Sequence, residues 1–141
     1  MQLLQVQDDD SWTAYHFIRR RVLYELRGRS DYDNTHPDEF QEGHFPLLFN
    51  VGGEPVGTVR LDITSEDAAV ATVRLVAILP QYQRRGIGKA MMNELERLAA
   101  TKGTRQLNVH AAHDAVTFYQ KLGWQLIDAT RKSPLLTKII S

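Results

Sequence analysis

The sequence predicts an α/β (α+β) fold in which a mixed, mostly antiparallel central sheet of about seven strands is flanked by about four helices. Two observations lead to this prediction. In the middle of the chain, apolar segments of strand length follow one another through short glycine-rich or polar turns, which join antiparallel strands. Later, strand-like segments alternate with helical ones, and such units favour parallel pairing. The 141 residues fit one domain, so we expect a single domain over residues 1–141.

The first third of the chain is predicted to form a strand, a helix and a long connection. The strand covers residues 2–6, and a run of aspartates then offers N-cap oxygens to a helix over residues 12–26. Gly28 is a helix stop signal. Residues 27–43 are polar and are predicted to form a loop with a short helix over residues 37–41. Connections of this length are usually functional or disordered.

Three strands are predicted next. An apolar strand over residues 45–51 is joined to a strand over residues 55–63 by Gly52-Gly53, because glycine accepts the positive φ angles of a tight hairpin. A polar turn over residues 64–67 leads into a longer strand over residues 69–79.

The second half alternates helix and strand. A helix over residues 87–102 has apolar side chains at helical spacing and is followed by a strand over residues 106–111. A short helix is predicted over residues 115–122, and glycine ends it. Strands over residues 124–129 and 135–140 complete the chain and are expected to pair with each other.

Composition and charge argue against several classes of function. Hydrophobic residues make up 43% and charged residues 24% of the chain, as in a globular protein. Lysine plus arginine and aspartate plus glutamate each number 17, and this zero net charge argues against a nucleic-acid or membrane-surface binder. Without cysteine, the chain forms no disulfide and has no thiol nucleophile. We find neither a secretory signal nor a run of ~18 apolar residues, so we expect a cytoplasmic protein.

The turn between the strand over residues 69–79 and the next helix predicts an anion site. Gly86 and Gly88 let the backbone approach a phosphate closely. The first amides of a helix lack internal partners, and the helix dipole adds positive charge there. Arg84, Arg85 and Lys89 add formal charge nearby. The alternative is a structural turn with a solvated basic edge.

Two other phosphate motifs fit this turn poorly. A P-loop requires serine or threonine after its lysine, and that position holds Ala90. The dinucleotide fingerprint requires a third glycine where this chain has Met91.

Two segments together resemble the GNAT family of N-acetyltransferases. Residues 76–90 resemble its acetyl-CoA signature, [Gln/Arg]-x-x-Gly-x-[Gly/Ala], through Gln83, Gly86 and Gly88. Residues 116–124, VTFYQKLGW, resemble the family's Phe-Tyr-x-Lys-Leu-Gly-Phe helix. The two segments stand in the family's order and at a suitable separation, and the predicted elements follow the family across nearly the whole chain.

The resemblance implies acetyl-CoA as co-substrate and a mode of binding it. In the family the fourth strand splays from the fifth, often with a bulge, and pantetheine pairs with the backbone in the gap like an added strand. Those strand residues can also be ordinary core residues, because the backbone binds while the side chains pack. The cofactor-binding residues implied are Val76, Ala77, Ile78, Gln83, Arg84, Arg85, Gly86, Ile87, Gly88, Lys89 and Asn108.

The resemblance also implies catalytic roles. Tyr119 matches the tyrosine that gives a proton to the departing thiolate, and a phenol with a pKa of ~10 holds that proton at neutral pH. Many members carry a glutamate base where this chain has Arg74, which either binds an acidic acceptor or pairs with a carboxylate. The base is then His110, His113 or a water chain. The amide of Ile78 would stabilise the oxyanion.

The expected reaction is direct transfer of the acetyl group to a primary amine of a small-molecule or peptide acceptor. The family lines its acceptor cleft partly with the first helix and the loop after it. Carboxylates of this loop either attract a cationic amine or are simply solvated. They are Asp31, Asp33, Asp38, Glu39 and Glu42. A homodimer is the assembly that the family implies.

Two other functions stay open at this point. The missing strand glutamate is compatible with a non-catalytic acyl-CoA-binding or sensor module. A nucleic-acid binder could use residues 83–85, although the zero net charge argues against it. His16, His36 and His44 lack the spacing of paired metal ligands, so we expect no metal.

Overall fold

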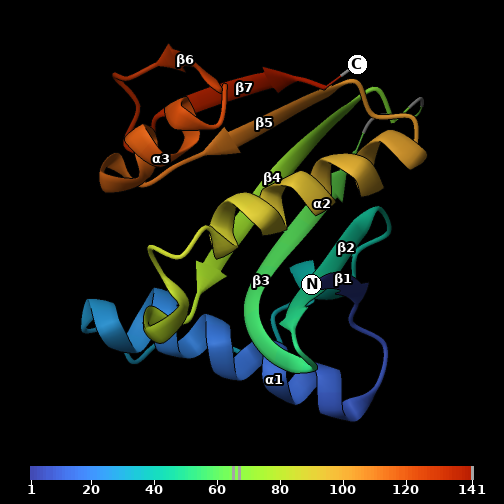
Figure 1. The fold of residues 1–141 in the computed structure, drawn as a ribbon, viewed down its shortest axis with the longest axis vertical. Helices are drawn as coiled ribbons and strands as arrows, with labels where there is room; N and C mark the ends of the chain where they lie inside the picture. The colour runs from blue at the N-terminus through green and yellow to red at the C-terminus, as the bar shows by residue number, and fades with distance from the viewer. Residues whose placement is uncertain (65, 67, 141) are drawn as a thin grey trace.

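The computed structural model describes residues 1–64, 66 and 68–140. Within them, one seven-stranded sheet has the strand order β1-β2-β3-β4-β5-β7-β6 (Figure 1). All neighbouring strands are antiparallel except β4 and β5, which are parallel. The strands are β1 (Gln2–Gln5), β2 (His44–Val51), β3 (Glu54–Ile63), β4 (Val70–Ile78), β5 (Gln106–His110), β6 (Gln125–Asp128) and β7 (Leu135–Ile139). The predicted fold class is confirmed, and the turn predicted over 64–67 lies partly outside the described residues.

Among the described residues there are three α-helices, one fewer than expected. They are α1 (Asp9–Arg19), α2 (Ile87–Thr101) and α3 (Val116–Lys121). The helix predicted over 37–41 is only a 3-10 turn, Pro37–Phe40, because the backbone becomes extended at Gln41. None of the helices in the described ranges has both the length and the apolar character needed to cross a bilayer.

The first helix begins earlier than predicted and changes its hydrogen bonding before it ends. Asp8 is the N-cap, and its carboxylate accepts from the Ser11 amide at 2.8 Å. After α1 the chain continues as a π-helical turn, Arg20–Tyr24, and a 3-10 turn, Glu25–Arg27. Gly28 ends it in the left-handed region at φ 73°, as the sequence predicted. Such π turns frequently lie at functional sites.

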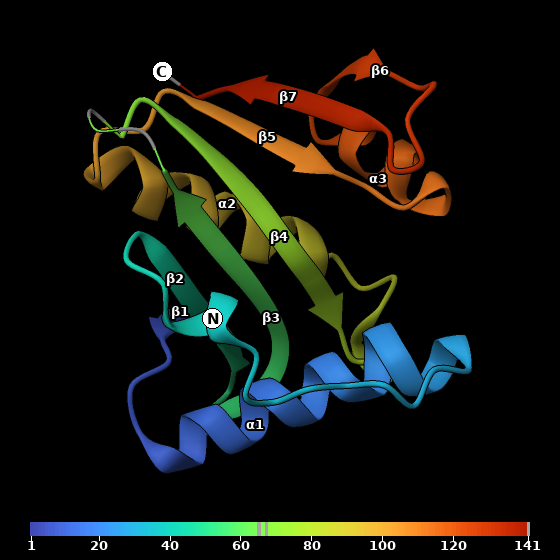
Figure 2. The same cartoon turned by 180° about the vertical axis from the view of Figure 1, so that it is seen from behind.

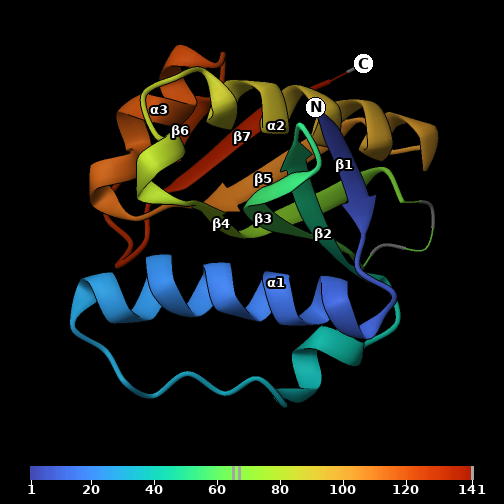
Figure 3. The same ribbon diagram turned by 60° about the horizontal axis from the view of Figure 1, so that its bottom comes forward.

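Helices cover both faces of the sheet (Figure 3). On one face, α2 buries Met91, Met92 and Leu95 against the main core. On the other face, Tyr15 and Ile18 of α1 pack in a second buried cluster with residues of the first strands and the end of β4. Each such side chain contributes ~1.5–3 kcal/mol by its burial, so both faces help to fix the position of β4.

A bulge in β4 changes which face its side chains occupy. Opposite β3, Arg74 pairs with Arg60 but Ala77 pairs with Thr58, so β4 carries an extra residue between them. The extra residue is accommodated at Leu75, whose backbone has a left-handed φ of 59°. Side chains alternate along a strand, so one extra residue reverses the order. Odd-numbered residues before the bulge face the α2 core, whereas Ala77 faces the α1 cluster.

Past the bulge, β4 and β5 no longer pair. Their parallel register runs from Val70–Gln106 to Val73–Val109 and then stops. The two strands diverge into a V whose open end lies between α3 and the end of the first helix (Figure 2). The splay and the bulge implied by the family resemblance are therefore both present.

Candidate active site

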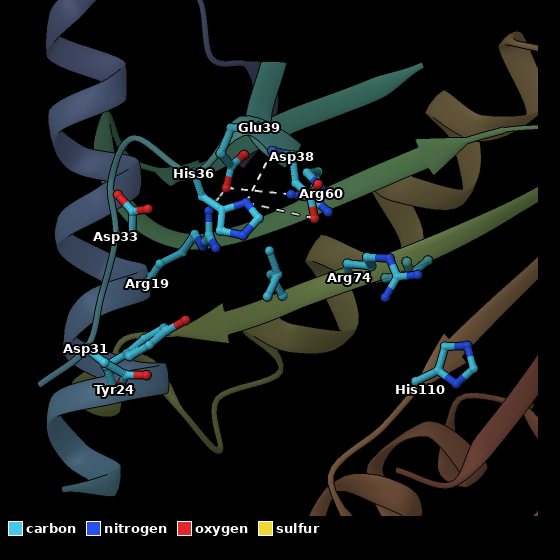
Figure 4. A pocket seen from close by; sticks show the side chains of 12 residues that line it. Arg19, Tyr24, Asp31, Asp33, His36, Asp38, Glu39, Arg60, Arg74 and His110 are labelled. Atoms are coloured by element: carbon cyan, nitrogen blue, oxygen red, sulfur yellow. Dashed lines mark hydrogen bonds and ion pairs between the residues drawn. The ribbon is translucent and has the colours of Figure 1, made fainter. Parts of the chain in front are cut away.

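Two cavities meet at the point where β4 and β5 diverge. The splay cavity, of about 380 Å³, is lined by the ends of β4 and β5 and by α3, including Val76, Ala115 and Tyr119. The polar cavity, of about 430 Å³, lies between β3, β4 and the loop after the first helix (Figure 4). Four residues line both: Tyr24, Val73, Leu75 and His110. A group in one cavity can therefore reach a group in the other beside the β4 bulge.

Tyr119 is held rigidly in the wall of the splay cavity. Its side chain is buried, and its ring meets the ring of Trp124 edge-on at 5.4 Å between centroids. Helix α3 ends just after it, where the Trp124 amide donates to the Tyr119 carbonyl at 3.1 Å. Burial raises the pKa of Tyr119 well above its ordinary value of 10.0. The phenol therefore stays protonated at neutral pH and can act as a proton donor.

The glycine turn leads into α2 as the sequence predicted. Gly86 has a φ of 77° and precedes the first residue of the helix, Ile87. Arg84 is also left-handed, at φ 62°. The side chains of Arg84, Arg85 and Lys89 are exposed. The turn thus presents helix-start amides and three solvent-facing cations, which is a geometry suited to an anion.

Side chains fasten this turn to β4 and α3. The Gln83 side-chain amide donates to the Ile78 carbonyl at 2.9 Å, which joins the turn to the end of β4. A Cβ on Gly88 would stand 3.1 Å from the Phe118 ring, so α2 and α3 approach each other at a glycine. On the β5 side, residues Val76–Ile78 have no strand partner, since that pairing stops at Val73.

A largely buried ionic network lies along the polar cavity, and all of its members described below except Asp62 line that cavity. Arg60 donates to both oxygens of Asp62, at 2.8 and 3.0 Å. Glu39 forms ion pairs with Arg19 and, at 3.7 Å, with Arg60. The Nε of Arg74 lies 3.0 Å from Asp62, so pairing with a carboxylate, one of the two roles left open for Arg74, is present. Buried charges are tolerated when they are paired and hydrogen-bonded in this way.

The predicted acidic rim differs from what the structure shows. Glu39 is not a free carboxylate, because it is buried against Arg19 and Arg60 and also accepts from the Tyr15 hydroxyl at 3.2 Å. Glu42 lies at a separate hollow beside Phe45.

The remaining three carboxylates of that rim, which line the polar cavity, already have local partners. Asp31 accepts from Arg29, Asp33 from Thr35, and Asp38 from Gln41. Of these three carboxylates only Asp31 is paired with a cation, because Thr35 and Gln41 are neutral donors that satisfy Asp33 and Asp38 without cancelling their charge.

The two candidate bases occupy different places. His110 lies where the cavities meet, whereas His113 is exposed in a 3-10 turn and lines neither of them. Partial burial, and after it the charges of Arg74 and Arg131, lower the pKa of His110 from its ordinary 6.5. The neutral imidazole that results at pH 7 can accept a proton.

Asn108 lies outside both cavity linings. Its side-chain oxygen accepts from Gln106 at 3.1 Å and from Thr137 at 2.8 Å. Its contact with pantetheine or substrate stays a prediction.

The other histidines have structural partners. His16 bonds the Tyr32 hydroxyl, His36 caps the 3-10 turn over residues 37–40, and His44 bonds the Asp38 carbonyl. Across residues 1–64, 66 and 68–140, no group of three or more histidine or carboxylate side chains could hold a metal ion.

Sequence reasoning missed the most buried members of the site. Arg60 and Asp62 occupy alternate positions of β3, where charged side chains would ordinarily face solvent. Tyr24 was also missed; it is the last residue of the π-helical turn and lines both cavities. The only sequence signal for Arg60 and Asp62 was that two charged residues interrupt the mostly apolar second half of β3.

Comparisons with known proteins agree with this site. A profile of the acetyltransferase (GNAT) family matches residues 9–124. The uncharacterised protein YyaT of Bacillus subtilis (strain 168) is 35% identical over 112 residues, which are 77% of this chain and 72% of that protein. A putative acetyltransferase of the same strain is 31% identical over 121 residues, covering 84% of this chain and 78% of the relative.

Solved structures share the fold. A putative N-acetyltransferase from Lactobacillus plantarum has a TM-score of 0.80 at 20% identity, with 99% of this chain and 98% of that one covered. An aminoglycoside 6′-N-acetyltransferase complexed with coenzyme A has a TM-score of 0.76 at 14% identity, covering 100% and 98%. The family profile, the relatives and the cavities beside a splayed β4 lead to one assignment. The chain belongs to the acetyltransferase (GNAT) family, whose members are acetyl-CoA-dependent N-acetyltransferases.

Proposed function

We propose that residues 1–141 form a single acetyltransferase domain that moves an acetyl group from acetyl-CoA directly to a primary amine. The observation that carries this proposal is the meeting of the two cavities beside Leu75, with a protonated phenol on one side and a neutral imidazole at the junction. One cavity provides room for a thioester and the other for an amine, so the two reactants can meet without a covalent enzyme intermediate.

The chain has matching groups for each part of acetyl-CoA. Residues 84–89 offer amides at the start of α2 and three exposed cations to the pyrophosphate. Val76–Ile78 offer an unpaired strand edge to the amides of pantetheine. Gln83 supports both parts, because its side chain joins the turn to Ile78. The thioester that acetyl-CoA supplies would then lie near Tyr119.

The proposed chemistry needs one proton acceptor and one proton donor. The amine nitrogen attacks the thioester carbonyl and forms the C–N bond, and the tetrahedral intermediate then collapses with cleavage of the C–S bond. His110 accepts the proton that the amine loses, and its position at the junction supports it over His113. Tyr119 donates its proton to the departing thiolate sulfur. Its raised pKa keeps the phenol protonated until that transfer.

A ligand-binding and turnover experiment tests this function. Acetyl-CoA at 100 times its Kd should stabilise the protein by ~2.7 kcal/mol, which is a rise of roughly 10 °C in Tm for a domain of this size. Adenosine 3′,5′-bisphosphate, which lacks pantetheine, should give a much smaller rise. Addition of a panel of primary amines should then release free CoA. Absence of a shift at millimolar acetyl-CoA would refute the proposed site.

A further inference from the structure

Arg74 occupies the last position of β4 before the bulge and faces the polar cavity. Val73 and Val109 are paired and buried on the α2 face, so the next residues, Arg74 and His110, lie on the opposite face. Figure 4 shows both side chains on this side of the sheet. The Arg74 side chain is 46% exposed, unlike the other arginines of the ionic network, so ligands in the cavity can reach it.

The charges of the network do not cancel. Its guanidinium groups belong to Arg19, Arg60 and Arg74, whereas its carboxylates are only Glu39 and Asp62. Both oxygens of Asp62 already accept from Arg60, and the nearest nitrogen of Arg74, its Nε, lies 3.0 Å from Asp62. Arg74 is the exposed arginine of the network, so the surplus positive charge of the network is accessible at its guanidinium group.

Within the described part of the chain, the other carboxylates of the cavity are hydrogen-bonded within their own loop or within the network and form no ion pair with Arg74. The cavity-lining Asp31, Asp33 and Asp38 accept from residues of their own loop. Among the described residues, Asp62 is the only carboxylate within 4.0 Å of a nitrogen of Arg74. A guanidinium anchored at one nitrogen can offer parallel N–H groups of its other nitrogens to an anion in the cavity that Arg74 lines.

We propose that Arg74 binds an anionic group, a carboxylate or a phosphate, which the acceptor carries close to the amine that is acetylated. This inference rests on the proposed function and names its substrate class: amino acids or phosphorylated amines, not polycationic amines. A fork of two N–H donors matches two oxygens of either anion. A second ammonium group at the same place would instead meet a fixed positive charge in a partly buried site.

A binding experiment tests this class without relying on turnover. CoA-saturated protein is titrated with N-acetylglycine and N-acetylglycinamide, and separately with O-phosphoethanolamine and ethanolamine, while backbone amide chemical shifts are recorded. The first pair differs in charge at nearly equal size, whereas the second pair differs by the whole phosphate group. We expect the anionic member of at least one pair to bind ten times more tightly or better. The pair that shows this difference identifies the anion as carboxylate or phosphate.

Variants assign the preference to Arg74. Arg74→Gln should make the two members of the preferred pair bind equally, and Arg74→Lys should keep a reduced preference because it retains the charge without the fork. Arg131→Gln is the matched control, since it removes a nearby exposed cation that lines neither cavity. It should leave the preference intact. Equal binding within both pairs, no binding of either anion, or a preference that survives in Arg74→Gln would each overturn the inference.

Turnover separates this inference from the function on which it rests. If kcat/KM favours glycine over glycinamide, or O-phosphoethanolamine over ethanolamine, and Arg74→Gln removes the difference, both are supported. CoA release from neutral amines and polyamines without any preference for anionic acceptors would refute the substrate class alone. Preferential binding of the anionic probes without CoA release from any amine would refute the transferase function alone.

Discussion

The splay cavity and the polar cavity share four residues, but of the two only the polar cavity is lined by carboxylates within the described ranges. The splay cavity is lined on its strand and α3 sides mostly by small apolar residues such as Val76, Ala111 and Ala115, while Arg27 and Arg29 line it from the end of the first helix. The polar cavity is walled by arginines and carboxylates from four separate segments. In the proposed function, the first side recognises a co-substrate common to the family through backbone geometry. The second side recognises an individual acceptor through charge.

The largest expected effect is a loss of stability when a buried carboxylate of the polar cavity is removed. Glu39→Gln removes the carboxylate between Arg19 and Arg60 and leaves buried guanidinium groups undercompensated. We expect the free energy of unfolding, measured in urea, to fall by about 3–5 kcal/mol. Glu94→Gln removes an exposed ion pair with Arg97 and should change stability by less than ~1 kcal/mol. Equal losses in the two variants would show that burial of the network matters little.

The next largest effect is expected on kcat, when the proposed proton donor of the splay cavity is removed. Tyr119→Phe keeps the buried ring but removes the proton donor, so kcat should fall by about 100-fold or more. The Kd of acetyl-CoA, measured by calorimetry, should change less than about twofold, because the binding groups are untouched. A variant with nearly full kcat would remove Tyr119 from the mechanism. If the wild type binds acetyl-CoA but never turns over, the chain is instead an acyl-CoA sensor.

A smaller effect tests whether the glycine turn binds anions. Gly86→Ala and Gly53→Ala both place a Cβ at a left-handed φ, 77° and 83°, with no atom within 4 Å. Each should lose roughly 1–2 kcal/mol of stability from the same backbone strain. Only Gly86→Ala should also raise the Kd of acetyl-CoA, by roughly tenfold, because it moves the amides at the start of α2. The same Kd in both variants would assign the turn a purely structural role.

The smallest expected effect is a shift in the pH profile of kcat/KM, which tests the role of His110 at the junction between the two cavities. The pKa of His110 lies below 6.5, so kcat/KM should be high above that pKa and should fall as the pH drops through it. Arg131→Gln removes one of the charges that lower this pKa. The acidic limb of the profile should therefore move to higher pH, by a few tenths of a unit, and the shift should shrink in high salt.

Two variants check the assignment of this acidic limb. His110→Asn should remove the limb, whereas His113→Asn should leave it in place because His113 lines neither cavity. A limb that persists in His110→Asn would show that another group or water accepts the proton.

The same contrast explains what the sequence could and could not predict. Gly86, Gly88 and Tyr119 lie in short segments whose local pattern determines their structure, so the turn before α2 and the helix with Tyr119 were found from sequence. The ionic network joins α1, the 3-10 turn over residues 37–40, β3 and β4, so no local pattern contains it. The bulge could not be predicted from its residues either, because leucine rarely adopts a left-handed φ such as that of Leu75.

The unpaired edge of β4 has a consequence for handling the protein. An exposed strand edge is a template for pairing with another chain, and here it lies beside a bulge instead of at the border of the sheet. In the proposed complex, pantetheine covers this edge. The ligand would then act as a stabiliser of the folded chain as well as a reactant. Purification and storage with coenzyme A should therefore slow self-association of the protein, and the cellular pool of CoA should influence how long each molecule lasts.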